Sequence, residues 1–69
     1  RTFANAKANL LLALFQAATT FKELKQYYSD NKGVVDELKA EDSGAALYVA
    51  TIFKQRGSAL KRIEEMING

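Results

Sequence analysis

Acidic residues stand side by side at Glu41–Asp42 and at Glu64–Glu65, among other places in the chain. Two carboxylates can share a proton or act as acid and base, but only when they converge on one point. Neighbouring positions on a helix point about 100° apart, so we expect both pairs to be solvated charge. The chain contains no histidine and no cysteine, which removes imidazole bases, thiolate nucleophiles and the usual zinc, haem and iron–sulfur ligands. We therefore predict no catalytic residues, no metal site and no cofactor, and a protein that is not an enzyme.

Three basic residues, Lys54, Lys61 and Arg62, share one face near the end of the chain. Such a face could contact phosphates with an affinity that depends on salt. The net charge is only +2 and Glu65 interrupts the basic stripe, so the clustered basic footprint of nucleic-acid-binding proteins is missing. A small nucleic-acid-binding or regulatory helical domain that uses these three residues is the alternative function.

The elements that must position these residues are helices. The 69-residue chain has no proline and 4 glycines, and it is rich in Ala, Leu, Lys and Glu, which lose little on entering a helix. We expect an all-α fold. A chain this short needs reinforcement, and without cysteine or metal ligands the remaining means are regular helix packing and oligomerisation. Because the chain begins with Arg1 rather than methionine, we expect a processed protein or part of a longer one.

Apolar residues spaced alternately three and four positions apart predict two long helices. The first runs from about residue 2 to 30, and the last from about residue 44 to 67. The inward seam of the first helix comprises Phe3, Lys7, Leu10, Leu14, Ala17, Phe21, Leu24 and Tyr28. The inward seam of the last helix comprises Val49, Phe53, Arg56, Leu60, Ile63 and Ile67.

Between the long helices, a short helix over residues 34–41 places Val34, Val35 and Leu38 inward. Gly33 fits the left-handed position after the end of the first helix. Asp42 or Ser43 is suited to be the N-cap of the last helix. Gly57 lies inside that helix and indicates a kink or a close approach of another helix. The predicted fold is an antiparallel helical hairpin with a short helical elbow, three helices in all, that bundles with other chains.

Residues 8–21, ANLLLALFQAATTF, carry no charge. A membrane-spanning helix needs about 20 apolar residues, and the seam continues beyond this segment into charged sequence. We therefore expect no transmembrane span. In a hairpin folded about Glu37, the last helix covers one side of the segment only, and the uncharged segment 44–53 is likewise half covered. The residues expected to stay uncovered are Leu11, Leu12, Phe15, Ala18, Ala45, Tyr48 and Ile52.

A helix that is apolar on all sides must be buried on all sides, so these seven residues predict a partner interface. The expected partners are protein, either further copies of the chain in a homo-oligomer or the helices of another protein. The predicted function is that of a non-catalytic structural protein that self-assembles or docks on partner helices, in the manner of a coiled coil. The alternative architecture is a compact three-helix bundle in which residues 34–38 cover the open side.

Overall fold

The computed structural model of the chain describes residues 2–68, and the surroundings of side chains over residues 4–67. Four helices follow one another in that range with short connections. They are α1 (Thr2–Ala17), α2 (Phe21–Asp30), α3 (Lys32–Glu41) and α4 (Ser43–Asn68). The all-α class predicted from composition is confirmed.

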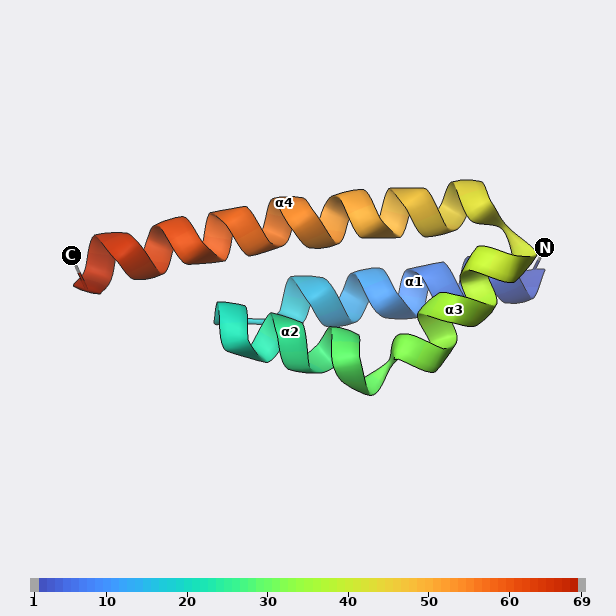
Figure 1. Cartoon of the computed structure of the whole chain (residues 1–69), viewed down its shortest axis with the longest axis horizontal. Helices are drawn as coiled ribbons and strands as arrows, with labels where there is room; N and C mark the ends of the chain where they lie inside the picture. Colours follow the sequence, from blue (N-terminus) through green and yellow to red (C-terminus); the bar gives the residue numbers. More distant parts are fainter. Residues whose placement is uncertain (1, 69) are drawn as a thin grey trace.

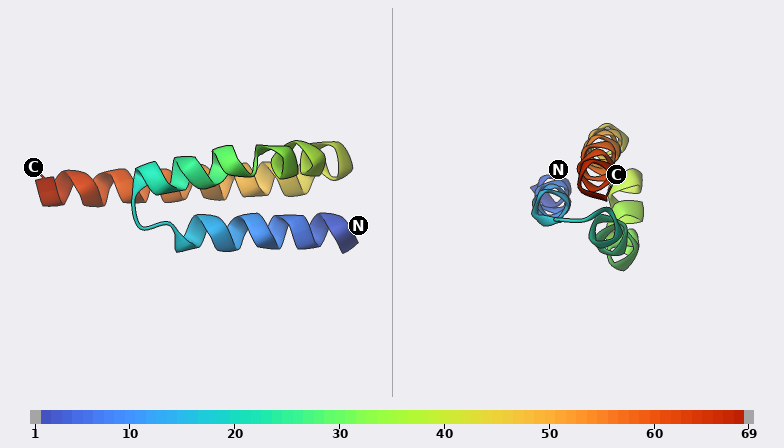
Figure 2. Two further views of the ribbon diagram at one scale, coloured as in Figure 1. Left: turned by 90° about the horizontal axis from the view of Figure 1, so that it is seen from below. Right: turned by 90° about the vertical axis from the view of Figure 1, so that its left-hand side faces the viewer.

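The helices form three rods, because α2 and α3 follow each other along one side of the molecule (Figures 1 and 2). The chain runs along α1, returns through α2 and α3, and then reverses again into α4. Consequently α1 and α4 point in the same direction, and the α2–α3 arm runs against both. The molecule measures 44 × 19 × 15 Å along its principal axes, and α4 accounts for most of its length.

The first long helix predicted from sequence is in fact two helices, α1 and α2, which fold back on each other at residues 18–20. Thr20 has an extended backbone (φ −133°, ψ 159°) and its hydroxyl accepts the N–H of Glu23. The Glu23 carboxylate in turn accepts the N–H of Thr19 at 2.7 Å. This Thr-x-x-Glu arrangement is a variant of the capping box, in which Glu23 bonds to the residue before the N-cap, and it begins a new helix. The prediction of three helices is therefore wrong, because this break divides the first predicted helix into two and gives four helices in residues 2–68.

The other two connections between consecutive helices, α2–α3 and α3–α4, are single residues. Asn31 separates α2 from α3, and its side-chain amide donates to the carbonyl of Tyr27 at 2.8 Å. The prediction of a left-handed Gly33 is wrong, because Gly33 lies inside α3 and no residue in the described range has a positive φ. At the last corner the Asp42 carboxylate accepts the N–H of Ala45 at 3.1 Å, which confirms Asp42 as the predicted N-cap.

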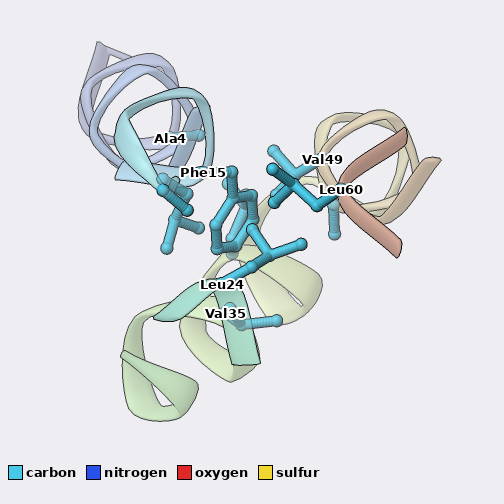
Figure 3. Close-up of a cluster of buried hydrophobic side chains, with 10 residues drawn as sticks. Ala4, Phe15, Leu24, Val35, Val49 and Leu60 are labelled. Carbon is cyan, nitrogen blue, oxygen red and sulfur yellow. The ribbon is translucent and has the colours of Figure 1, made fainter. Parts of the chain in front are cut away.

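The core lies where the three rods meet (Figure 3). Phe15 is fully buried at its centre, with the ring of Phe53 edge-on at 5.2 Å and the ring of Tyr28 stacked at 6.2 Å. The buried apolar residues come from every helix and comprise Ala4, Leu11, Phe15, Ala18, Leu24, Val35, Leu38, Ala46, Val49 and Leu60.

The predicted hairpin is wrong in its direction of packing. It placed the first helix antiparallel to the last, whereas α1 is parallel to α4 and also contacts α2 and α3. As a result the buried line of α1 is one position out of phase with the predicted seam: Leu10 is 51% exposed while Leu11 is buried. The side chain of the first seam residue, Phe3, lies outside the described range. The alternative compact bundle is closer to the structure, since Val35 and Leu38 are buried against the other helices.

Gly57 lies at a close contact between α2 and α4. A Cβ built at this position would lie 3.1 Å from Cε1 of Phe21 and 3.6 Å from Cδ2 of Leu24. The α4 helix continues through Gly57 without interruption. Of the two roles predicted for this glycine, close approach is the one observed.

Candidate interaction surface

Three of the seven residues predicted to face a partner are inaccessible. Leu11, Phe15 and Ala18 each have 0% of their surface exposed. The expectation that the chain could not cover them fails because α2 folds back on α1 and supplies the second covering surface. These three residues therefore belong to the core of the chain.

The other four predicted residues keep accessible surface along the boundary between α1 and α4. Tyr48 is 57% exposed, Ile52 is partly exposed, and Leu12 and Ala45 are partly buried against the core. A shallow depression continues this boundary toward the end of α4. Its lining residues are Gln16, Ile52, Gln55, Arg56 and Ala59.

Beyond this depression, three large exposed apolar side chains cluster on the last two turns of α4. Ile63 is 49% exposed, and Met66 and Ile67 are each 77% exposed. Figure 1 shows α4 running past the ends of both α1 and α2 at this point. We call Ile63, Met66 and Ile67 the overhang surface.

Sequence periodicity placed Ile63 and Ile67 in the inward seam of the last helix. Leu60 lies seven residues before Ile67 on the same side of α4, and it is only 3% exposed. The apolar pattern of α4 therefore continues beyond the helices that cover it, and the overhang surface is the uncovered remainder of that pattern.

Arg56 of α4 fixes where α1 ends. Its guanidinium Nη2 donates to the carbonyl oxygen of Ala18 at 2.9 Å and to that of Gln16 at 3.4 Å. A cation at this end of a helix satisfies free carbonyls and interacts favourably with the helix dipole. The Nε of the same side chain is buried without a hydrogen-bond partner in residues 2–68. The seam position of Arg56 is thus explained by a contact within the chain.

Glu64 of α4 fixes where α2 begins. Its carboxylate accepts the backbone N–H of Phe21 at 2.7 Å, across 43 positions of sequence. An anion at a helix N-terminus is stabilised by the free N–H groups and by the dipole. Sequence reasoning missed this role, although opposite charges eight residues apart on one side of α4 are the signal that could have indicated it.

The basic residues of the alternative function are exposed, but one of them is engaged. The ammonium group of Lys61 lies 5.1 Å from the centroid of the Phe21 ring, and the ammonium group of Lys25 lies at the same distance. Lys54 and Lys61 both line a shallow groove between α2 and α4. Arg62 is exposed next to Ile63. Only two of the three cations share this groove, which supports a phosphate-binding surface less well than Ile63, Met66 and Ile67 support an apolar one.

At the opposite end of the molecule, Lys7 of α1 joins α3 through two ion pairs. Its ammonium lies 2.6 Å from Glu41 and 3.3 Å from Glu37. The hydrogen bond to Glu41 is the main reason that the pKa of Lys7 is raised above its ordinary value, and Glu37 adds to the effect despite partial desolvation. This contact ties the free end of α1 to the rest of the bundle.

Other kinds of site receive no support from the geometry. In the described part of the chain, no group of three or more acidic side chains converges as a metal site would require. No helix within residues 2–68 is long and apolar enough to cross a membrane. Comparisons of the chain with models of protein families, with curated proteins and with solved structures find no match.

Proposed function

We propose that this protein is a non-catalytic interaction module that associates with protein helices through the overhang surface of α4. The observation that carries the proposal is the exposure of Ile63, Met66 and Ile67 in a chain whose other apolar seam residues on α4 are covered. Full burial of one Ile or Met side chain contributes about 1.5–3 kcal/mol. A partner helix laid along the last two turns of α4 would gain this contribution.

The charge around the overhang surface favours association with an uncharged helix face. Lys61, Arg62, Glu64 and Glu65 are two cations and two anions, so their long-range fields largely cancel. The surface therefore recruits partners by apolar contact, and we expect its binding to persist at high salt. This behaviour separates it from phosphate binding, which weakens steeply as salt rises.

The experiment is a measurement of mass by sedimentation velocity between about 10 µM and 1 mM, in low and high salt. We expect association that is retained in high salt and is lost in the double variant Met66→Glu/Ile67→Glu. Leu47→Glu is the matched control, because Leu47 is 70% exposed on the same helix but lies far from the overhang. Circular dichroism confirms that each variant keeps its helical content.

If the double variant associates as strongly as the unaltered chain, the overhang surface is not the interface. Association that disappears in high salt, or that depends on Lys54, Lys61 and Arg62, would show an interface made by charged groups and would contradict an apolar one.

A further inference from the structure

The corner between α1 and α2 is made by side chains rather than by residues that break helices. Its residues are Ala18, Thr19 and Thr20, with no glycine or proline. The corner depends on the Thr20 cap and on the contacts made by Arg56 and Glu64. An uninterrupted helix would replace these contacts with ordinary backbone hydrogen bonds from each N–H to the carbonyl four residues earlier. The same residues can therefore be satisfied in a bent or in a straight helix.

A straight helix would also extend the packing between α2 and α4. In the structure α2 contacts α4 through Phe21 and Leu24, which touch the Gly57 position, and through Tyr28, whose ring lies 4.7 Å from that of Phe53. The same three–four spacing, continued toward the N-terminus, reaches residues that are exposed or half-buried in the bent arrangement. These residues are Leu10, Leu14 and Ala17.

On the complementary line of α4, Leu60 is covered and the end at Ile67 is left open. Phe53 and Leu60 belong to the line that meets α2, and the next position on it is Ile67 of the overhang surface. Since α2 runs against α4 with its first residue beside Glu64, a straight continuation would bring Ala17 and Leu14 alongside the last turns of α4. The bent arrangement thus leaves Leu10, Ala17 and Ile67 exposed, and a straight helix would bring this side of α1 and the end of α4 together.

We propose that two copies of this chain exchange α1. In each copy residues 2–30 form one uninterrupted helix, and α1 packs into the core of the other copy. This inference rests on the proposed function and deepens it by naming the partner as a second copy. Because α1 is parallel to α4 and α2 is antiparallel to it, the exchange aligns the two α4 helices in opposite directions. Their overhang surfaces then lie at the centre of the dimer.

Only a second copy of the chain fits both surfaces that such straightening creates. The released face of α1 carries Leu11, Phe15 and Ala18, and the vacated core has their shape. An identical α1 restores all of these contacts, as it does the pairing of Lys7 with Glu37 and Glu41. Exchange of an identical element is a low-cost route to a symmetric dimer. It also enlarges an interface that three overhang side chains alone would leave below the usual 800 Å² or so per partner.

The test is a distance within one chain, measured by pulsed electron–electron double resonance. Spin labels are attached at Asn5→Cys and Ser29→Cys, two exposed positions in a chain without cysteine. In a straight helix these 24 intervening steps span about 36 Å, whereas in the bent arrangement the labels lie on adjacent helices whose axes are about 10 Å apart. Dilution with unlabelled chain removes distances between copies.

We expect the fraction of molecules that show the distance of about 36 Å to grow with protein concentration, in proportion to the fraction of dimer. A dimer that shows only the short distance overturns the exchange but leaves the proposed function standing. A chain that stays monomeric with the short distance at 1 mM overturns the exchange and also self-association through the overhang surface. A long distance in the monomer also overturns the exchange, because straightening then needs no second copy.

Two variants of the corner sharpen the result. Thr20→Ala removes the helix cap and favours the straight helix, so we expect the dimer population to rise about fivefold or more. Two glycines inserted between Thr19 and Thr20 interrupt the straight helix, and we expect the dimer association constant to fall by at least about twentyfold. The matched control is the same insertion between Asn31 and Lys32, which should leave the dimer unchanged. If all three variants dimerise equally, the corner does not control association and the exchange is wrong.

Discussion

Leu60 and Ile67 lie two turns apart on the same side of α4, yet one is 3% exposed and the other 77%. Both occupy the apolar line that faces α2, and the helix between them is regular. What differs is what covers them, because α1 ends and α2 begins level with residues 56–64 of α4. The comparison teaches that an apolar pattern specifies the inward side of a helix, whereas the corners of other helices decide how far burial extends. The predictions below test this difference between the covered and the uncovered part of the bundle.

The largest effect is expected at the centre of the covered part. Phe15→Ala removes a ring with 0% exposure that contacts Phe53 and Tyr28, and we expect the free energy of unfolding to fall by about 3–5 kcal/mol. Since a domain of this size is stable by about 5 kcal/mol, the variant should be largely unfolded. Urea denaturation followed by circular dichroism measures the change. Met66→Ala, in the uncovered part, should change the stability by less than about 0.5 kcal/mol, and a similar loss in both would contradict the comparison.

A smaller effect is expected where α2 and α4 touch. Gly57→Val places methyl groups into the space held by Phe21, which a Cβ alone would approach to 3.1 Å. We expect a loss of about 2 kcal/mol, within the range for overpacking a filled site. The same substitution at the exposed neighbour, Ser58→Val, is the control and should be close to neutral. Equal thermal stability of the two variants would show that α2 does not pack closely on Gly57.

Loss of the Arg56 contact should cost somewhat less. Arg56→Met keeps an apolar stem but removes the donor to the carbonyls of Ala18 and Gln16. We expect a decrease of about 1.5 kcal/mol, the lower end for a hydrogen bond with a charged group. Arg62→Met changes the net charge equally at an exposed position. Chemical denaturation of the two variants side by side tests the role of Arg56, and no difference between them would reject it.

The smallest effect is expected at Lys7. Because its pKa is raised in the folded chain by Glu41 and Glu37, the ion pair stabilises the fold below the ordinary lysine pKa of about 10.4. That contribution is lost as the pH rises through the raised value. The stability difference between the unaltered chain and Lys7→Met should therefore be constant from about pH 7 to 9, then vanish at higher pH, and shrink in 1 M salt. A difference that grows above pH 10 would have the wrong sign.

Local features of the fold could be predicted from the sequence, because they depend on neighbouring residues. The helical class, the helix end at Asp30 and the Asp42 cap belong to this group. The capping box at Thr20 and Glu23 is equally local and was present in the sequence, but the continuing heptad pattern concealed it. The buried line of α1 could not be predicted in this way. Leu10 and Leu11 differ by a rotation of about 100°, and the choice between them depends on where α2, α3 and α4 lie around α1.

The candidate surface shows the same difference between features set by neighbouring residues and features set by distant contacts. Tyr48 and Ile52 keep exposed surface as expected, whereas Phe15 is buried by an arm that the predicted hairpin lacked. Ile63 and Ile67 were assigned inward because their spacing is regular. Their exposure depends on Arg56 and Glu64, which contact residues about 40 positions away in sequence. A local sequence pattern does not predict contacts between residues so far apart in the chain.

The position of these two contacts has a consequence for the order in which the chain folds. The bonds at the first corner join Arg56 to Ala18 and Glu64 to Phe21, which are separated by 38 and 43 residues. A chain made from its N-terminus therefore reaches residue 30 long before either partner exists. Contacts between distant residues also form later than local ones, because a large loop must close first. During synthesis the first 30 residues have the Thr20 cap and the contact of Phe15 with Tyr28 to bend them, and the arrival of α4 completes the corner.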